Sequence, residues 1–376
     1  MLLLSGPNIA GNEWKYVKDC LDTGWVSSVG SYVDQFEKMS AAFAGTKYAV
    51  ATSSGTTALH ICLVMLGVNE KDYVITPNVT FIATCNSIKY TGADPILIDA
   101  DVNTWQMDLA LLEEFLEKET EQRGSVCYHK KDGRRIPVIM PVHVLGNMCD
   151  MDRLISIAKK HNLIVVEDST EALGSYYKGK HAGSFGLMGT FSYNGNKIVT
   201  TGGGGMIVTN DEAFAKKAKH LTTQAKSDPF EYIHDEIGYN YRLVNVAAAM
   251  GVAQMEQLPG FLKRKKEIIA FYKKELEGCV DIQFQQVSED VNPNWWLPTI
   301  KTEKQKQLLD ALNAEKMQSR PFWRPMNQLP MFTECLFYNH NNVSDFIYKR
   351  CLSIPCSTYI TDEQLKSVSD TIKKHV

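Results

Sequence analysis

Apolar residues recur along the first half of the chain in two alternating patterns. In one pattern they stand three or four residues apart, as on one face of an amphipathic helix. This spacing predicts helices around residues 14–21, 36–43, 59–66 and 109–116. In the other pattern, short apolar runs are bounded by turn residues, and each run has the length of a strand that is buried on both faces. These runs predict strands at 72–77, 95–100, 136–141, 163–168, 189–193 and 204–209.

The pattern changes near residue 245. Before it, strands alternate with helices, which implies a mostly parallel sheet covered by helices. After it come two long helical segments, 246–258 and 261–276, then a stretch rich in Trp and Pro and a final helix near 362–374. We therefore expect an α/β protein with a large domain over 1–245, including the N-terminal helix, and a smaller C-terminal domain over 246–376. The polar connection at 118–135 is predicted to be a surface loop or hairpin.

Composition excludes several classes of partner. The 376 residues include 40 Lys and Arg against 43 Asp and Glu, a net charge of -3. No basic surface for nucleic acid or for an acidic membrane is therefore expected. Nine cysteines are scattered without a CxxC pair, which predicts reduced thiols in the core and no metal site. The start, MLLLSGPN, lacks a basic region and a long apolar run, so a cytoplasmic protein is expected.

The stretch SSGTTALH, residues 53–60, joins a polar turn to an apolar helix. Free N–H groups and the positive end of the helix dipole make such a start a site for phosphate. Gly55 would let a phosphate approach the backbone, and Thr56 would add a hydroxyl. An ordinary helix start capped by serine explains the same residues.

LIVVEDSTEALG, residues 163–174, is an apolar strand that ends in two acids. A carboxylate there, Asp168, can hold a ring nitrogen protonated, bind a metal or cap a helix. An ATP site of the phosphate-loop type would need GxxxxGK[ST], and a dinucleotide site GxGxxG after a strand. The sequence contains neither, and it also lacks the HExxH of zinc peptidases.

A single lysine, Lys197, stands among small residues in FSYNGNKIVTTGGGG, residues 191–205. A phosphate site, a strand-end carboxylate and an enclosed amine are together what pyridoxal 5'-phosphate requires. The hypothesis is that Lys197 bonds covalently to this cofactor. Partial burial would lower the pKa of Lys197 and favour its neutral, nucleophilic form.

These motifs carry a family resemblance over most of residues 5–260. SGPNIAGNEWKYVKDCLDTGWVSSVG, SSGTTALH, PNVTFIAT, VVEDSTEALGSYYKGKHAGSFG, FSYNGNKIVTTGGGG and IGYNYRLVNVAAAMG resemble the DegT family of sugar-nucleotide aminotransferases. Later segments, RPFWRPMNQLPMF and LSIPCS, are similar to the subgroup that acts in legionaminic acid and related pathways. The resemblance implies the fold type I, aspartate aminotransferase-like architecture, with an α+β C-terminal domain. It also implies a homodimer with active sites shared between subunits.

The resemblance assigns roles to individual residues. Lys197 matches the lysine that bonds to the cofactor, and Asp168 matches the partner of the pyridine nitrogen. Phe81 matches the aromatic that stacks on the ring, and Glu171 stands where many relatives carry a glutamine near the ring hydroxyl. The phosphate contacts are matched by Gly55, Thr56, Ser192 and, from the neighbouring subunit, Asn240.

Substrate contacts are indicated by residue type and neighbourhood. Arg242, Arg324 and Trp323 are candidates for a nucleotide diphosphate, and Trp25 and Ser27 for the entrance. Surface ion pairs and a core tryptophan would explain them equally well. Many relatives have a histidine where Asn327 stands, and His143 is expected to be a buried, hydrogen-bonded histidine.

The resemblance implies transfer of the amino group of L-glutamate to a keto sugar on a nucleoside diphosphate. The subgroup favours a UDP-linked 4-keto-6-deoxy-N-acetylhexosamine for a surface glycan such as lipopolysaccharide. A GDP-linked 4-keto-6-deoxymannose and a 3-keto sugar stay open. A regulatory protein on the same scaffold is the alternative of another class, and the balanced charge gives it no support.

Overall fold

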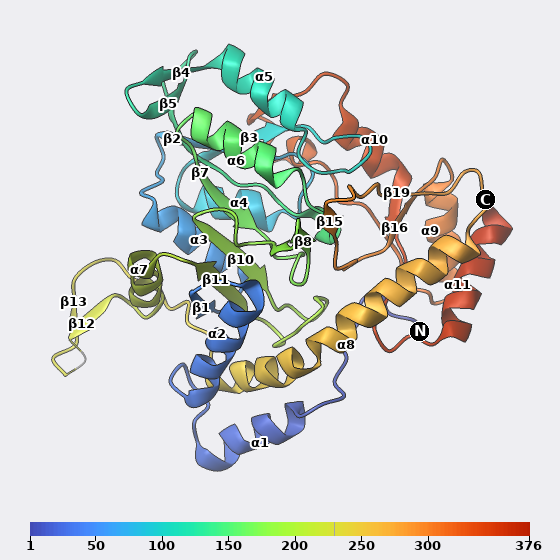
Figure 1. Cartoon of the computed structure of the whole chain (residues 1–376), viewed down its shortest axis with the longest axis horizontal. Helices are drawn as coiled ribbons and strands as arrows, with labels where there is room; N and C mark the ends of the chain where they lie inside the picture. Colours follow the sequence, from blue (N-terminus) through green and yellow to red (C-terminus); the bar gives the residue numbers. More distant parts are fainter. Residues whose placement is uncertain (229) are drawn as a thin grey trace.

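A large twisted sheet forms the centre of the molecule (Figure 1). The computed structural model describes residues 1–228 and 230–376. The strands of this sheet are β1 (Tyr48–Thr52), β2 (Asp72–Pro77), β3 (Asp94–Ile98), β4 (Thr120–Arg123), β5 (Val126–His129), β6 (Arg135–Ile139), β7 (Ile164–Asp168), β10 (Met188–Ser192), β11 (Gly205–Thr209) and β18 (Leu336–Tyr338). Their order is β1-β11-β10-β7-β6-β2-β3-β18, with the β4–β5 hairpin attached through β6. Pairs from β10 to β18 are parallel and β11 is antiparallel to both neighbours, which confirms the predicted α/β class.

Alternate residues of the central strands face opposite layers of helices, as the two-residue period of a strand requires. Val74 and Val138 pack with helices α3 (Gly55–Met65), α4 (Ala83–Tyr90) and α7 (Glu212–Thr222). Their neighbours Ile75 and Ile139 pack with α5 (Leu109–Glu119) and α6 (Met151–Lys160). Burial on both faces explains why these strands are continuous apolar runs in the sequence.

Helix α8 (Asn245–Glu275) links the two ends of the molecule (Figure 1). It packs against α1 (Glu13–Thr23) and α2 (Ser31–Ala44) at one end and against α11 (Asp362–His375) near the other. The sequence indicated two helical segments here, and the structure joins them through Pro259. Proline removes one helical hydrogen bond. Burial of Leu258 and Phe261 on either side holds the helix continuous.

The C-terminal part of the chain builds a small antiparallel sheet with helices beside it. Its members are β14 (Gln283–Phe284), β16 (Thr299–Lys301), β17 (Arg320–Pro321), β19 (Cys351–Ser353), α9 (Gln305–Ala314), α10 (Val343–Arg350) and α11. Strand β18 leaves this region and pairs with β3 of the large sheet. Helix α8 and strand β18 both connect the C-terminal region to the large sheet. The division into a large domain, 1–245, and a small domain, 246–376, therefore stays a proposal.

Shorter elements complete the described chain. They are β8 (Tyr176–Tyr177), β9 (Lys180–His181), β12 (Lys226–Asp228), β13 (Ile233–His234), β15 (Val291–Asn292), and the 3-10 turns η1 (Val144–Gly146) and η2 (Met326–Gln328). The β12–β13 hairpin projects from the body of the molecule (Figure 1).

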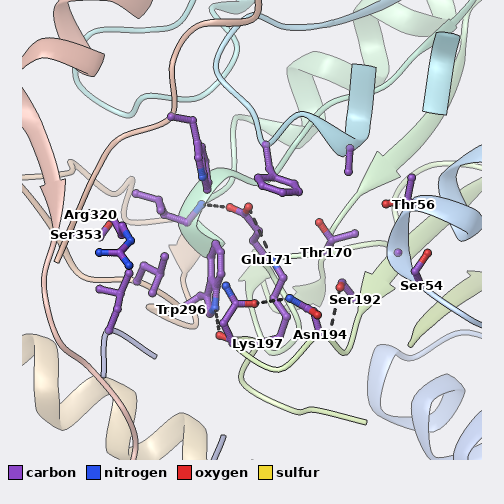
Figure 2. A pocket seen from close by; sticks show the side chains of 18 of the residues that line it. Ser54, Thr56, Thr170, Glu171, Ser192, Asn194, Lys197, Trp296, Arg320 and Ser353 are labelled. Carbon is purple, nitrogen blue, oxygen red and sulfur yellow. Dashed lines mark hydrogen bonds and ion pairs between the residues drawn. The ribbon is translucent and has the colours of Figure 1, made fainter. Parts of the chain in front are cut away.

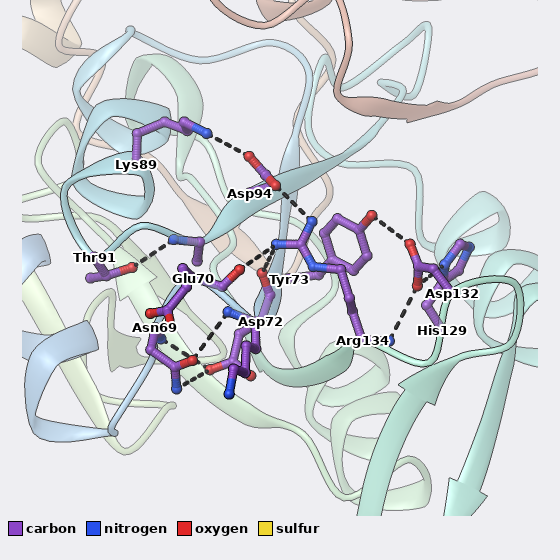
Figure 3. Close-up of polar contacts among 12 residues, drawn as sticks. Asn69, Glu70, Asp72, Tyr73, Lys89, Thr91, Asp94, His129, Asp132 and Arg134 are labelled. Atoms are coloured by element: carbon purple, nitrogen blue, oxygen red, sulfur yellow. Dashed lines mark hydrogen bonds and ion pairs between the residues drawn. The ribbon is translucent and has the colours of Figure 1, made fainter.

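The polar connection at 118–135 contains the β4–β5 hairpin, as predicted. Figure 3 shows the contacts that fasten its end to the sheet. Arg134 Nη1 donates to Asp94 Oδ2 at 2.6 Å, and its guanidinium lies 3.8 Å from the centre of the Tyr73 ring. Tyr73 Oη donates to Asp132 Oδ2 at 2.8 Å. These contacts lie where β2 and β3 begin, at the sheet edge opposite to the carboxyl ends of the strands.

All nine cysteines are free and seven of them are buried, in agreement with the prediction of reduced core thiols. Across residues 1–228 and 230–376, none of the helices combines the length and apolarity that crossing a membrane requires.

Candidate active site

A cavity of about 410 Å³ lies at the carboxyl edge of the large sheet. Parallel sheets bind ligands at this edge, because the loops that follow the strands meet there. In Figure 2, Ser54, Thr56 and Ser192 lie on one side of the cavity and Arg320 and Ser353 on the opposite side. Glu171, Lys197 and Trp296 lie between them.

The first turn of α3 forms one end of the cavity. The Ser54 hydroxyl accepts from Thr57 N at 3.1 Å, and Thr57 Oγ1 accepts from Ser54 N at 3.0 Å, a reciprocal capping box. This fixes the helix start, where first-turn N–H groups have no partner within the helix. A Cβ at Gly55 would stand 2.9 Å from Thr170 Cγ2 and 3.0 Å from Ser192 Cβ. Because Gly55 has no side chain, space remains at this end of the cavity, between the first turn of α3 and Ser192; we call it the phosphate cup. Its N–H groups and hydroxyls are suited to bind a phosphate.

Asp168 lies at the end of β7 and is buried. Its Oδ2 accepts from Thr84 Oγ1 at 2.6 Å, and its Oδ1 accepts from Thr170 Oγ1 at 2.7 Å and Thr170 N at 3.2 Å. Three donors therefore fix the orientation of this carboxyl group. Thr84 and Thr170 fall within the quoted motifs, and the sequence reasoning missed both as site residues.

Lys197 follows β10 in a short turn, and its side chain is 13% exposed. Nζ lies 3.7 Å from the centre of the Trp296 ring and 3.8 Å from Glu171 Oε1. Burial lowers the pKa of Lys197, and the charges of Glu171 and Asp168 oppose this effect. This lowered pKa agrees with the prediction made from the sequence, because it favours the neutral amine of Lys197.

Glu171 is buried beside Lys197. Its Oε2 accepts from Leu145 N at 2.8 Å, while Oε1 faces the lysine. Burial raises the pKa of Glu171 to about 7, although the Lys197 charge and the Leu145 hydrogen bond lower it.

Aromatic side chains form one wall of the cavity. The Trp296 and Trp323 rings are stacked with centroids 6.4 Å apart, and Phe81 meets the edge of Trp323 at 6.5 Å. Trp296 Nε1 donates to Asn196 O at 2.8 Å, one residue before Lys197. The carbonyl of Trp296 accepts from the buried Lys265 Nζ of α8, also at 2.8 Å.

The structure brings together part of the residues selected from the sequence. Seven of them line the cavity: Gly55, Thr56, Phe81, Glu171, Ser192, Lys197 and Trp323. Asp168 lies just behind it, joined to Thr170 of the cavity wall.

The other selected residues lie elsewhere in the monomer. Trp25 and Arg242 line a second cavity between α2 and the start of α8, where Arg242 Nη1 lies 3.0 Å from Glu37 Oε1. Ser27 is exposed at the surface, and its carbonyl accepts from Asn245 N. Arg324 is exposed and donates to Tyr348 Oη at 3.3 Å. Asn240 is exposed on the segment before α8.

Two other residues singled out in the sequence have structural partners. Asn327 exchanges two hydrogen bonds with Asn78, each 2.9 Å long. His143 is fully buried, with Nε2 2.9 Å from Glu167 Oε2. Its Nδ1 has no partner within the described chain, so the expected histidine is hydrogen-bonded on one side only.

Sequence comparison connects the cavity with known enzymes. Residues 7–373 match the profile of the DegT/DnrJ/EryC1/StrS aminotransferase family. GDP-perosamine synthase of Escherichia coli O157:H7 is 39% identical over 371 residues, which are 98% of this chain and 96% of that protein. A UDP-4-amino-4,6-dideoxy-N-acetyl-beta-L-altrosamine transaminase of Campylobacter jejuni is 31% identical over 366 residues, which are 95% of this chain and 92% of that protein.

Solved structures agree with the sequence comparison. The PLP form of the Streptococcus pneumoniae protein Spr1654 is 26% identical and superposes with a TM-score of 0.87 over 98% of this chain and 97% of that one. Its PMP form is 25% identical, with a TM-score of 0.88 over 98% of both chains. The fold type I expectation is thereby confirmed.

Proposed function

The chain belongs to the DegT/DnrJ/EryC1/StrS aminotransferase family and uses pyridoxal 5'-phosphate, and we propose that it moves the amino group of L-glutamate to the keto carbon of a nucleotide-linked keto-deoxy sugar. One observation carries this proposal. The Lys197 amine, held in a cavity that favours its neutral form, shares that cavity with the Gly55 cup.

The residues present fit the cofactor. Gly55, Thr56 and Ser192 would hold its phosphate, Phe81 would cover one face of its ring, and Asp168 would accept from the ring nitrogen. When bound, pyridoxal 5'-phosphate supplies an electron sink for the charge that develops when a proton leaves the carbon bearing the amine.

Lys197 performs the proton transfers in this proposal. As a neutral amine, Nζ accepts the proton of the α carbon of the donor, and the resulting ammonium is stabilised by Glu171 and by the Trp296 ring. Thr84 and Thr170 donate hydrogen bonds to Asp168 and fix the position of its carboxyl group at the end of β7. The aromatic wall would shield the reacting atoms from water on one side.

The acceptor sugar is proposed to carry the ketone at C4. The sequence resemblance favours the UDP-linked 4-keto-6-deoxy-N-acetylhexosamine, and the Campylobacter jejuni transaminase is in line with a UDP-linked substrate. The GDP-linked 4-keto-6-deoxymannose is the second candidate. Three proteins named GDP-perosamine synthase, 33–39% identical to this chain, support it.

A homodimer with shared sites is part of the proposal. The segment that precedes Asn240 in the chain carries exposed apolar side chains, including Phe230 at 91% and Ile237 at 83% exposure. Apolar surface of this kind marks contact sites between proteins. In the dimer, Asn240 would reach the phosphate cup of the neighbouring subunit.

The test begins with the covalent link. Purified protein is loaded with the cofactor, reduced with borohydride and digested, and mass spectrometry locates the modified peptide. We expect the label on Lys197 and none in a Lys197→Ala variant; a label on another lysine would contradict the assignment.

The substrate is then identified by competition. Loaded enzyme and L-glutamate are incubated with the UDP-linked and the GDP-linked 4-keto sugars side by side, and the amino sugar is detected by mass spectrometry. Absence of an amino product from both would refute the acceptor class. Light scattering gives the mass of the particle, and a monomer would refute the shared site.

A further inference from the structure

We propose that Glu171 is the proton partner of Lys197: Glu171 Oε1 takes up and returns the proton that converts the Lys197 ammonium into the amine. The inference rests on the proposed role of Lys197 and goes beyond it. It concerns the carboxyl group that stands where many relatives carry a glutamine.

The two oxygens of Glu171 have separate tasks. Oε2 is fixed by the N–H of Leu145 at 2.8 Å, while Oε1 faces Lys197 Nζ at 3.8 Å. Leu145 adopts a left-handed backbone conformation, φ 61°, that directs its N–H into the site. The carboxyl group therefore keeps its orientation in either protonation state, with one oxygen available to the lysine.

Asp168 and Glu171 stand three residues apart and differ in their surroundings. The carboxyl group of Asp168 receives three hydrogen bonds from Thr84 and Thr170, whereas within the described residues the carboxyl group of Glu171 receives one, from Leu145. A carboxylate with more donors is more stable in its charged form. Two neighbouring acids with environments this different are suited to different tasks.

Burial favours the neutral form of both members of the pair. It lowers the pKa of Lys197 and raises the pKa of Glu171 to about 7. A buried ion pair at 3.8 Å recovers only part of its desolvation cost, so transfer of one proton that leaves an amine and a carboxylic acid is accessible.

The transfer balances in atoms and charge. One Nζ–H bond breaks and its electron pair stays on nitrogen, while the proton forms an O–H bond at Oε1. A direct hydrogen bond needs about 2.8 Å between the heavy atoms, so the lysine side chain moves by about 1 Å or one water bridges the gap.

The neighbouring elements contribute few other charges. Lys197 and Asp168 are the titratable groups whose charges act on Glu171. Leu145 contributes its N–H, Asn294 Nδ2 donates to the Glu171 carbonyl, and the Trp296 ring faces the lysine. A change in the titration of Glu171 or Lys197 therefore reports on this pair.

The test compares wild type with Glu171→Gln, which keeps an acceptor for Leu145 N and removes the exchangeable proton. In the cofactor-free protein, trace acetic anhydride labels unprotonated lysines, and mass spectrometry gives the extent at Lys197 as a function of pH. We expect two steps for the wild type, because the pair titrates jointly. Glu171→Gln should give one step, at a pH about 1 unit lower, since the carboxylate that stabilises the ammonium is gone.

Glu289→Gln is the matched control, because it removes an exposed carboxylate outside the cavity. Its labelling curve should coincide with that of the wild type. Identical curves for wild type and Glu171→Gln, with unchanged melting temperatures, would overturn the proposal.

A reciprocal measurement separates proton exchange from simple attraction. In infrared difference spectra, the band of a protonated carboxyl group should appear in wild type at a pH near 7 and be absent from Glu171→Gln. In Lys197→Met it should persist to higher pH, because the cation that favours the carboxylate is removed. A Glu171 band that is the same with and without Lys197 would overturn the coupling.

In the loaded enzyme, the rate of the half-reaction with glutamate should reach its maximum at lower pH in Glu171→Gln. The two proposals fail in different ways. Borohydride label on a lysine other than 197 would refute the proposed role of Lys197, while label on Lys197 with superimposed titration curves would refute only the role of Glu171.

Discussion

Trp296 Nε1 donates a hydrogen bond to the carbonyl of Asn196 at 2.8 Å, which ties the aromatic wall to the turn that carries Lys197. The same indole lies 3.7 Å from the lysine nitrogen. Two segments about a hundred residues apart in sequence thus place one amine, and the position of Lys197 depends on both.

Replacing this indole should change the titration of the lysine. In Trp296→Leu the ammonium loses a cation–π contact worth about 0.5–2 kcal/mol, so the pKa of Lys197 should fall by about 0.4–1.5 units. The labelling curve of the cofactor-free protein measures the change. Trp295→Leu is the control, since the Trp295 ring faces Lys273 outside the cavity and its loss should leave the curve unchanged.

The phosphate cup should not tolerate a side chain at residue 55. In Gly55→Ala the new Cβ would meet Thr170 and Ser192 at about 3 Å, and relieving such crowding costs about 1–3 kcal/mol. Cofactor affinity should fall by about 5- to 150-fold, measured by absorbance titration.

Gly260→Ala provides the contrast within helix α8. A Cβ at Gly260 meets no atom within 4 Å, and alanine is the better helix former. Its cofactor affinity should equal that of the wild type. Equal affinity in Gly55→Ala would contradict the role of the cup.

The network at the far edge of the sheet should matter for stability and leave the catalytic rate unchanged. Arg134→Leu removes the hydrogen bond to Asp94 and the contact with the Tyr73 ring, which connect the β4–β5 hairpin to β2 and β3 (Figure 3). We expect a destabilisation of about 1–3 kcal/mol, seen as a lower melting temperature. A large loss of kcat at a temperature where the variant is folded would contradict this separation.

Asp94 should contribute to acid denaturation. Burial by itself raises the pKa of Asp94, but hydrogen bonds from Lys89 and Arg134 outweigh it, so the pKa lies below its ordinary value. A depressed folded-state pKa stabilises the protein above the unfolded-state value, about 3.9, and this stability is lost as the pH falls through the folded-state pKa. Melting temperatures at pH 6 and pH 3 should differ less in Asp94→Asn than in wild type, and an equal difference would refute the assignment.

Six strands of the large sheet and several residues of the site could be predicted from the sequence for a common reason, whereas β1 and β18 were not predicted. Strands buried on both faces are continuous apolar runs, and residues just after such strands gather at one edge of a parallel sheet. Asp168 and Ser192 end two predicted strands, and because the structure makes these strands parallel neighbours, both residues lie at the same edge of the sheet. Gly55 joins them because β1 lies in the same sheet and α3 follows it.

The remaining contacts depend on tertiary packing that leaves no local signal. Trp296 and Arg320 enter the cavity from the C-terminal region, where the strands are two or three residues long and show no clear period. Arg242 and Trp25 resemble ligand-binding residues by type, yet in one chain they line a separate cavity. The two helical segments predicted on either side of Pro259 form one helix, with the buried Leu258 and Phe261 next to the proline.

Lys265 connects the long helix α8 to the segment that carries Trp296. Its ammonium group is shared between the carbonyls of Trp296 and Cys356, each at 2.8 Å, deep in the interior. A tilt of α8 would pull the indole away from the amine that it supports. The position of the indole beside Lys197 therefore depends on α8 as well as on the turn that carries the lysine.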